Sequence, residues 1–317
     1  MIYTGIDIGG TKCAVVAGNA DGIACKIKFE TTSVEETLDN IIKAVEKLGA
    51  NAAIGISCGG PLDSKRGIIM SPPNLPGWDD IEIVKMLEDR FGVPTGIQND
   101  ANACALAEWR YGAGCGVENM VFLTFGTGMG AGLILNGKLY CGTNDMAGEV
   151  GHIRISEYGP VGYGKIGSFE GFCSGGGIAE IGKMVARERL QRGEKTAFCE
   201  CFAELESITA KKIAECAKIG DKSAIYVYDI CAEKLGAGIS LLIDILNPER
   251  IVIGSIYERS GELLRDKMQA VIDRETLAYT NTVCRIVPAK LGDSIGDWAA
   301  LAVAEGMLKN RNCSKNR

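Results

Sequence analysis

The sequence predicts a mixed α/β protein built of two similar lobes, and three observations lead to that fold class. Three short apolar runs joined by glycine turns open the chain, and a similar set returns roughly 120 residues later. Strand-like runs alternate with amphipathic helical patterns. The chain has 317 residues, which is enough for two lobes that each have a core.

The first lobe opens with YTGIDI, CAVVAG and ACKIKF, which read as consecutive strands joined by tight turns. Residues 34–48 carry apolar side chains at helical spacing and predict a helix. AAIGIS and PTGIQN are further short strands, and Asp100 opens an apolar helix that ends near Tyr111.

The second lobe repeats this beginning, with NMVFLTF as a strand, GTGMG as a glycine turn and AGLILNG as the returning strand. A long helix is expected from about Lys222 to Leu246, because Pro248 cannot continue it. RIVIG and CRIVPAKL are late strands, and a last helix over 297–308 should pack back on the first lobe. We expect residues 1–112 with 296–317 in one lobe and 113–295 in the other, with a cleft between them.

Composition and charge exclude several classes of protein. The net charge of −6 offers no basic footprint for nucleic acid, and no segment approaches 18 uninterrupted apolar residues, so no membrane span is expected. The beginning of the chain lacks a basic region of the kind that opens a secretory signal. Thirteen cysteines, an odd number and mostly within apolar runs, are read as reduced thiols of a cytoplasmic protein.

The first motif is DIGGTK, at a strand–turn–strand. Gly9 and Gly10 lack Cβ atoms, so the turn can bring backbone N–H groups against phosphate oxygens. Thr11 and Lys12 add a hydroxyl and a cation, and Asp7 is placed to orient Mg²⁺ through water. A plain Gly-Gly hairpin explains the motif equally well when it is taken alone.

The second motif is TFGTGMGAG, whose alternating glycines leave one face of an extended chain bare for a ligand. It includes Thr127 and Gly128. The dinucleotide-binding spacing is absent, and no helix follows. Two such turns in equivalent places are harder to explain by packing than one.

Two polar motifs complete the set. QNDANA stands at a strand-to-helix junction, where Asp100 is either an N-cap carboxylate or a general base that accepts a hydroxyl proton during phosphoryl transfer. Asn99 beside it suits the neighbouring hydroxyl of a polyol. GEVGHIRI holds His152, the single histidine of the chain, which is either structural or a ligand of ring hydroxyls.

These motifs together resemble the ROK family of repressors, open reading frames and kinases. DIGGTK, SCGGPLD, NLPGW, QNDANA, FGTGMGAG and GEVGH occur in the order and spacing of that family, over nearly the whole chain. The resemblance implies the two-lobed actin-like, hexokinase-like (ribonuclease H-like) ATPase fold. It also implies that Asp100 is the catalytic base. The sugar-binding positions it implies are Gly60, Asn74, Asn99, Glu149 and His152.

One stretch departs from the family pattern. The family has C-x-C-G-x-x-G-C-x-E, whose cysteines join the histidine to hold a structural zinc, whereas this chain has VGYGKIGSFE. Val161, Tyr163 and Ser168 stand at the cysteine positions and are poor or absent zinc ligands, so no structural zinc is expected. The retained Glu170 implies that the loop still closes over the sugar, with some other partner orienting His152.

On the nucleotide side, Gly254 matches the first glycine of a family pair, and Ser255 replaces the second. ATP with Mg²⁺ is the implied phosphoryl donor, because the phosphates need charge neutralisation. The resemblance also implies a homodimer. Glucose is the first expectation for the acceptor.

N-Acetylmannosamine, N-acetylglucosamine, fructose, mannose and allose kinases share much of the pattern and stay open as alternatives. A repressor would need a DNA-binding segment before the first glycine motif, and Asp7 stands too early for one. A sugar sensor without catalysis is disfavoured by Asp100 and the two turns. An actin-like ATPase without a sugar substrate is disfavoured by NLPGW and GEVGH.

Overall fold

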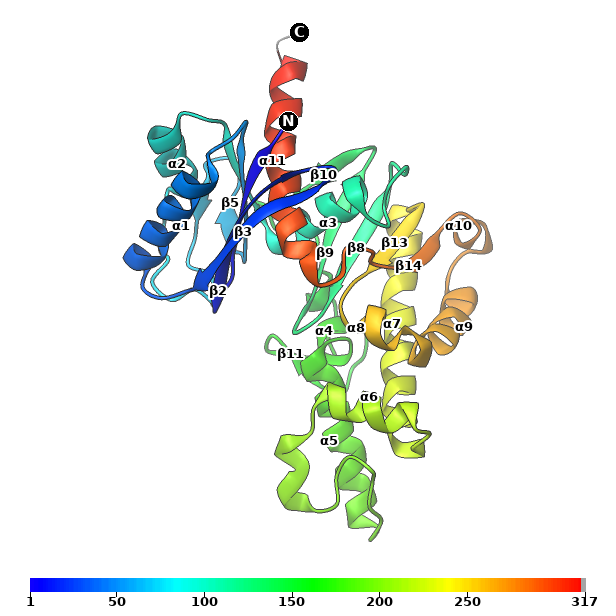
Figure 1. Ribbon diagram of the computed structural model, residues 1–317. Coiled ribbons are helices and arrows are strands. Elements are labelled where there is room, and N and C mark those ends of the chain that lie inside the picture. Colours follow the sequence, from blue (N-terminus) through cyan, green and yellow to red (C-terminus); the bar gives the residue numbers. More distant parts are fainter. Residues whose placement is uncertain (315–317) are drawn as a thin grey trace. The chain divides into compact units, whose positions relative to one another are not determined.

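The computed structural model describes residues 1–314, which form two compact units (Figure 1). The first unit contains Met1–Glu118, Gly132–Ala147 and the chain from Lys290 onwards. The second contains Asn119–Ala131 and Gly148–Ala289.

The first unit is organised around a five-stranded sheet of order β3-β2-β1-β4-β7. Its strands are β1 (Tyr3–Ile8), β2 (Lys12–Asn19), β3 (Gly22–Glu30), β4 (Ile54–Cys58) and β7 (Thr95–Asn99). The first three are antiparallel, and β4 and β7 continue the sheet parallel to β1. The strands expected from the opening runs are confirmed.

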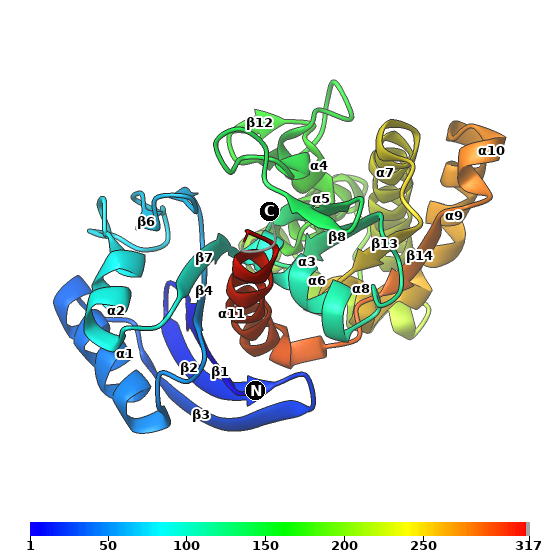
Figure 2. The ribbon, with the colours of Figure 1, turned by 90° about the horizontal axis from the view of Figure 1, so that it is seen from above.

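One face of this sheet is covered by α1 (Val34–Leu48) and α2 (Ile83–Phe91), as Figure 2 shows. Ile6 and Ile8 of β1 point to that face and join a core cluster with Ile41 of α1 and Leu87 of α2. Ser33 caps α1 by accepting the Glu36 N–H at 3.3 Å. The predicted helix over residues 34–48 is confirmed at both ends.

The other face carries a row of glycines on which α11 (Ile295–Ser314) packs. Gly5, Gly55 and Gly96 are paired in register across β1, β4 and β7. A Cβ on Gly55 would lie 2.2 Å from the Ala300 carbonyl oxygen, and one on Gly5 would lie 2.9 Å from Ala300 Cβ. The row therefore lets α11 approach the backbone of the sheet, and the expected packing of the last helix on the first lobe is confirmed.

The helix α3 (Asp100–Tyr111) follows β7 directly, as the sequence predicts. Glu108 near its C-terminal end is fully buried, and its carboxylate accepts backbone N–H groups from Ala113, Lys290 and Leu291 at 2.6–2.9 Å. These bonds tie α3 to the segment that leads into α11. Three short strands also belong to the unit: β5 (Leu62–Asp63), β6 (Ile68–Ile69) and β10 (Lys138–Tyr140).

The second unit contains three adjacent parallel strands: β8 (Met120–Phe125), β13 (Arg250–Ile253) and β14 (Arg285–Pro288). The strand β9 (Met129–Leu135) begins in this unit and ends in the first, where it pairs with β10. A two-residue hairpin, β11 (Val161–Gly162) and β12 (Lys165–Ile166), follows the single-turn helix η1 (Val150–His152).

Helices make up most of the rest of the second unit, as expected beyond Gly171. They are α4 (Phe169–Phe172), α5 (Gly175–Gln191), α6 (Ala210–Lys218), α7 (Lys222–Leu246), α8 (Ile256–Ser260), α9 (Arg265–Glu275) and α10 (Ala278–Asn281). The long helix α7 contacts α4, α5, α6 and α9, and Figure 1 shows it in yellow among them. It ends at Leu246, as predicted, with Asn247 in the left-handed region.

Over residues 1–314, none of the helices combines the length and the apolar character needed to cross a lipid bilayer.

Candidate active site

The first glycine turn is closed by bonds within the first unit. The Gly9 N–H donates to the Lys12 carbonyl at 3.1 Å. From the end of β3, the Thr31 hydroxyl donates to the Gly9 carbonyl at 2.6 Å, and the Thr31 N–H donates to the Thr11 carbonyl at 3.1 Å. Gly10, Thr11 and Lys12 are exposed at this turn. Their N–H, hydroxyl and ammonium groups are the donors that the sequence predicts for phosphate.

Asp7 lies at the end of β1, just before this turn, and its carboxyl group is crowded. A Cβ on Gly296, at the start of α11, would lie 2.6 Å from an Asp7 carboxyl oxygen. The pKa of Asp7 is raised to about 6, first by burial and then by the negative charges of Asp297 and Asp100. Asp297 itself is buried and forms an ion pair with Lys26 of β3. The approach of α11 therefore builds a small acidic group beside the turn.

Asp100 is the first residue of α3 rather than its cap. The cap is Asn99, whose Oδ1 accepts the Asn102 N–H at 2.8 Å. One carboxyl oxygen of Asp100 accepts the Ala101 N–H at 2.8 Å. The side chain keeps contact with solvent, but the protein atoms around it displace water, and this burial raises the pKa of Asp100. The N-cap alternative for Asp100 is thus removed.

Two other predicted sugar positions lie in the same unit. A Cβ on Gly10 would lie 2.4 Å from the Asn74 carbonyl oxygen, so the Asn74 backbone lies against the glycine turn. The Asn74 side chain lies beside Gly59, where a Cβ would be 3.1 Å from Asn74 Oδ1. Space around Gly60 is open, since a Cβ there would meet nothing within 4 Å. The structure therefore brings the first turn, Asn74 and the SCGG segment together.

The second glycine turn is held by different partners. Gly126 donates its N–H to the Gly128 carbonyl at 3.1 Å, and the Gly130 N–H donates to the Thr124 hydroxyl at 2.8 Å. Glu170 accepts the Met129 N–H through Oε2 at 3.0 Å. A Cβ on Gly128 would lie only 2.7 Å from that Oε2. The predicted sugar residue Glu170 thus also buttresses the second turn.

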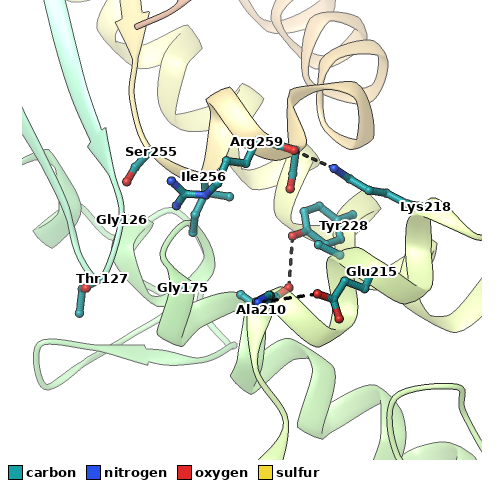
Figure 3. A pocket seen from close by; sticks show the side chains of 13 residues that line it. Gly126, Thr127, Gly175, Ala210, Glu215, Lys218, Tyr228, Ser255, Ile256 and Arg259 are labelled. Carbon is teal, nitrogen blue, oxygen red and sulfur yellow. Dashed lines mark hydrogen bonds and ion pairs between the residues drawn. The ribbon is translucent and has the colours of Figure 1, made fainter. Parts of the chain in front are cut away.

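A cavity of about 550 Å³ opens beside this turn, entirely within the second unit (Figure 3). Its volume falls within the ordinary range for small-molecule sites. It is lined by Gly126, Thr127, Gly175, Ala210, Lys211, Ala214, Glu215, Lys218, Tyr228, Ser255, Ile256, Arg259 and Ser260. The Tyr228 hydroxyl and the Lys218 ammonium group donate to backbone carbonyls of Ala210 and Arg259, which fixes two walls.

The lining of the cavity is locally basic although the chain is acidic overall. Lys211, Lys218 and Arg259 outnumber Glu215, the single acidic side chain among the lining residues. Lys211 approaches Glu215 at 4.0 Å, and Lys218 pairs with Glu262 at 3.0 Å. Figure 3 shows Arg259 reaching past Ile256 on the side of the cavity where Gly126 and Ser255 lie. An anionic ligand in this cavity would meet cationic side chains as well as the backbone of the turn.

Gly254 lies behind the cavity wall rather than in it. Its N–H donates to the Leu123 carbonyl at 3.0 Å, and a Cβ there would lie 3.3 Å from the Phe122 ring. Ser255 and Ile256 line the cavity in its place. Gly254 therefore acts as a close-packing position that sets the direction of the lining residues after it.

Glu149 and His152 lie at the beginning of a loop that runs to α4, and both are exposed. The His152 ring lies 6.4 Å from the Tyr163 ring, edge to face, and the Lys165 ammonium group donates to the His152 carbonyl at 2.7 Å. Ser168 caps α4 by accepting the Gly171 N–H at 3.1 Å. Over residues 1–314, no group of three or more His, Cys, Asp or Glu side chains is arranged to hold a metal ion.

Sequence reasoning did not find the cationic wall of the cavity. Lys211, Glu215 and Lys218 recur at spacings of four and three on α6, which is the pattern of an ordinary solvated helix face. Arg259 lies in the last turn of the short helix α8 and belongs to no motif. Only the folded chain shows that these side chains face the second glycine turn.

Comparisons with known proteins agree with this arrangement. The model of the ROK family matches residues 3–306. A glucokinase of Halalkalibacterium halodurans is 32% identical over 93% of this chain and 92% of its own length. A glucokinase of Thermotoga maritima is 29% identical over 94% of this chain and 96% of its own length. A xylose repressor of Caldicellulosiruptor bescii is 28% identical over 91% of this chain and 74% of its own length.

Solved structures show the same fold. A ROK family glucokinase from Streptomyces griseus, in complex with glucose and AMPPNP, superimposes with a TM-score of 0.76 at 30% identity, covering 96% of this chain and all of that one. A ROK hexokinase from Thermus thermophilus superimposes with a TM-score of 0.80 at 26% identity, covering 98% of this chain and all of that one. The fold is therefore the two-lobed, actin-like ATPase fold, and the chain belongs to the ROK family.

Proposed function

We propose that this protein is an ATP-dependent sugar kinase that transfers the γ-phosphoryl group to a hexose hydroxyl, with glucose as the favoured acceptor. The observation that carries the proposal is Asp100, at the start of α3 and next to a capping asparagine. Glucokinases at about 30% identity support sugar kinase activity as the general class. The acceptor and the mechanism are inferences from the residues of this chain.

Asp100 has the properties of a general base for a sugar hydroxyl. One of its carboxyl oxygens accepts the Ala101 N–H at 2.8 Å, which holds the carboxyl group in place, and the residue is exposed to solvent. Its raised pKa brings the carboxylate closer to the range where proton acceptance is efficient. Because phosphoryl transfer depends mostly on positioning and charge stabilisation, a carboxylate that orients the hydroxyl and accepts its proton late in the step is sufficient.

Asn99 supplies a second contact with the acceptor. Its Oδ1 is used as the cap of α3, so its amide N–H₂ is the group left to donate to a hydroxyl. Asn74 and Gly60 lie on the same unit and are proposed to complete the contacts with the sugar. From the second unit, Glu149 and His152 are proposed as further hydroxyl ligands.

The nucleotide is proposed to bind in the cavity of the second unit, with its phosphates against Gly126, Thr127 and Gly128. The lining cations favour an anionic ligand, and the volume suits a nucleoside phosphate. Asp7, Gly9, Gly10, Thr11 and Lys12 are proposed to receive the terminal phosphate from the first unit.

Mg²⁺ fits a site in which few protein ligands are needed. The described residues hold no three-ligand metal cluster, and magnesium is commonly bound by one or two carboxylates together with substrate phosphates and water. Asp7 is the proposed carboxylate, and the repulsion from Asp297 and Asp100 that raises its pKa is what a nearby cation relieves. When bound, the ion supplies charge neutralisation to the phosphates. No structural zinc is proposed.

One experiment distinguishes glucose from other acceptor sugars and tests whether the protein is catalytic at all. ADP release would be measured with Mg-ATP across glucose, mannose, fructose, allose, N-acetylmannosamine and N-acetylglucosamine, for the wild type and Asp100→Asn. We expect turnover on one or two sugars, glucose first, and a loss of about 10²–10⁴-fold in kcat in the variant. Asp89→Asn, on the exposed surface of α2, is the control and should leave kcat unchanged.

The opposite result has a definite meaning. If none of the sugars is phosphorylated while glucose still binds, the protein is a sugar sensor. One of its relatives is a xylose repressor, which is consistent with that alternative. If Asp100→Asn leaves turnover unchanged, the catalytic base is another residue. A homodimer in the cytoplasm is part of the proposal, and its assembly is checked by sedimentation of the wild type.

A further inference from the structure

The loop that carries His152 is closed by its own backbone. The Ile155 and Ser156 N–H groups donate to the Gly167 carbonyl at 2.9 and 3.1 Å, and the Phe169 N–H donates to the Ile153 carbonyl at 2.8 Å. The Gly167 N–H donates to the Pro160 carbonyl at 3.0 Å. These bonds fix the base of the loop between residues 153 and 169.

Two glycines make this closure close-packed. A Cβ on Gly167, which has a φ of +67°, would lie 2.0 Å from the Ser156 carbonyl oxygen. A Cβ on Gly162 would lie 2.5 Å from the Gly171 N–H nitrogen and 2.7 Å from the Ser168 hydroxyl. Larger side chains at these two positions would force the strands of the loop apart, so the base is rigid by construction.

His152 itself lies outside this rigid base. It is the last residue of η1 and is exposed, and the β11–β12 hairpin brings two side chains to it. Tyr163 places its ring edge to face with the imidazole, at a centroid distance of 6.4 Å and an interplanar angle of 79°. Lys165 donates to the His152 carbonyl at 2.7 Å. One residue therefore contacts the ring and the other holds the backbone.

The backbone at Tyr163 is an independent sign that its placement is costly. Tyr163 and Gly164 form the two-residue turn of the hairpin, with φ values of +45° and +73°. A turn with both values positive favours Asn-Gly, and a bulky tyrosine at the first position is strained. Its side chain is also 78% exposed, so the strain is not compensated by burial in the core. Such strain is typical of positions held for function.

We propose that Tyr163 and Lys165 are positioning residues that hold His152 in the orientation in which its ring contacts a hydroxyl of the sugar acceptor. The inference rests on the proposed function. Edge-to-face aromatic pairs lie at centroid distances of roughly 4.5–7 Å and restrict the rotation of both rings. The ammonium group of Lys165 keeps the His152 backbone from turning away, because it bonds the carbonyl of the same residue.

The decisive variant is Tyr163→Asn, because it removes the ring and also relieves the turn. Asparagine adopts positive φ far more readily than tyrosine, so this variant should be at least as stable as the wild type. A purely structural role for Tyr163 predicts normal kinetics in it. The positioning role predicts that KM for the sugar rises about three- to tenfold, while kcat and KM for ATP stay unchanged.

Three other variants complete the kinetic test. Tyr163→Phe keeps the ring and should keep the wild-type KM. Lys165→Met keeps the aliphatic stem but loses the donor, and should raise KM for the sugar in the same direction. Tyr158→Ala is the matched control, because Tyr158 is 80% exposed in the same loop and has no ring contact with His152 among the described residues.

A second readout does not depend on turnover. The chain has one histidine, so protein labelled at histidine and purified without a histidine tag gives a single set of imidazole resonances by NMR. Tyr163→Asn should move the His152 ring signals, because the neighbouring aromatic ring current is lost, whereas Tyr158→Ala should leave them in place. Glucose added to the wild type should move the same signals.

The outcomes separate the inference from the proposed function. If the wild type phosphorylates none of the sugars but Tyr163→Asn still shifts the imidazole signals, the kinase assignment fails and the contact with His152 stands. The inference is overturned if the imidazole signals of Tyr163→Asn coincide with those of the wild type. It is equally overturned if KM for the sugar is unchanged in Tyr163→Asn and Lys165→Met.

Discussion

The two glycine turns are alike in sequence and differ in what surrounds them. The first turn, at Gly9 and Gly10, is closed by Thr31 and lies beside the acidic side chains of Asp7, Asp297 and Asp100. The second turn, from Gly126 to Gly130, is closed by Thr124 and buttressed by Glu170. Its free side opens on a cavity with three cationic side chains.

This difference assigns the turns different tasks in the proposed reaction. An acidic neighbourhood suits a metal ion and the proton transfer from a hydroxyl, whereas a basic cavity suits the phosphates of a nucleotide. A glycine turn is therefore only a place where backbone can approach a ligand closely. The charged residues that other elements bring to it decide which ligand that is.

The largest expected effect is at Gly10, where the turn lies against Asn74. A Cβ would lie 2.4 Å from the Asn74 carbonyl oxygen, so Gly10→Ala must push two backbone segments apart. We expect a loss of about 2 kcal/mol in the free energy of unfolding, together with a loss of sugar and nucleotide turnover of at least tenfold. Denaturant unfolding and the coupled ADP assay measure the two effects.

Two further substitutions turn this into a comparison. Gly22→Ala, in the neighbouring β2–β3 turn, meets nothing within 4 Å of the new Cβ and should leave both quantities unchanged. The Cβ of Gly126→Ala would meet only the Ser255 side chain, at 3.3 Å from its hydroxyl oxygen, so the second turn should tolerate this change far better than the first tolerates Gly10→Ala. Equal losses at Gly10 and Gly126 would show that the surroundings of the turns do not matter.

The next effect concerns the acidic character of the first turn. Asp7 ionises with a pKa raised from 3.8 to about 6, chiefly by burial and then by Asp297 and Asp100. The folded protein therefore binds this proton more tightly than the unfolded chain does. The protonated side chain stabilises the fold at a pH below its unfolded pKa, and this stabilisation is lost as the pH rises through about 6. Asp7→Asn removes that loss and should stabilise the protein at pH 8 by about 2 kcal/mol, with reduced turnover.

The pH dependence is the control for this prediction. The advantage of Asp7→Asn should shrink as the pH is lowered from 8 to 4, because Asp7 of the wild type becomes protonated over that range. Asp89→Asn, at an exposed position on α2, should track the wild type at each pH. If the difference in stability between Asp7→Asn and the wild type were the same at every pH, ionisation of Asp7 would not destabilise the fold.

Much of the fold could be predicted because it is encoded by local patterns. Both ends of α1 follow from its apolar spacing, and α7 ends where Pro248 forbids continuation. The row of Gly5, Gly55 and Gly96 could not be recognised, because its three members come from separate strands and align only through sheet register. That row brings Asp297 to Asp7, so the acidic group of the first turn is a product of tertiary packing.

The site divides in the same way. Asp100, Asn99 and the glycine turns stand in short motifs, and the structure places them where their elements begin and end. Lys211, Lys218 and Arg259 belong to no motif, and the contact of Tyr163 with His152 joins residues eleven positions apart across a hairpin. Chemistry that depends on neighbours in sequence is readable from the chain, and chemistry that depends on neighbours in space is not.

The smallest expected effect is at Ser255, on the cavity beside the second turn. Its backbone has φ +59° and ψ −104°, a conformation that glycine adopts without strain and serine does not. Ser255→Gly should therefore raise the free energy of unfolding by about 1 kcal/mol and the Tm by about 2 °C. Thermal unfolding measures both, and KM for ATP should change little, because the hydroxyl is one of many groups that line the cavity.

Asn247→Gly is the control that separates the relief of backbone strain from the general effect of introducing a glycine. Asn247 also has positive φ, at +44° with ψ +55°, but this is the left-handed helical region that asparagine tolerates. Its replacement by glycine should leave Tm unchanged or slightly lower, since glycine costs more entropy on folding. If Ser255→Gly behaves like Asn247→Gly, the serine is not strained. The cavity wall would then be as relaxed as the backbone of the first turn, which has no positive φ from Asp7 to Lys12.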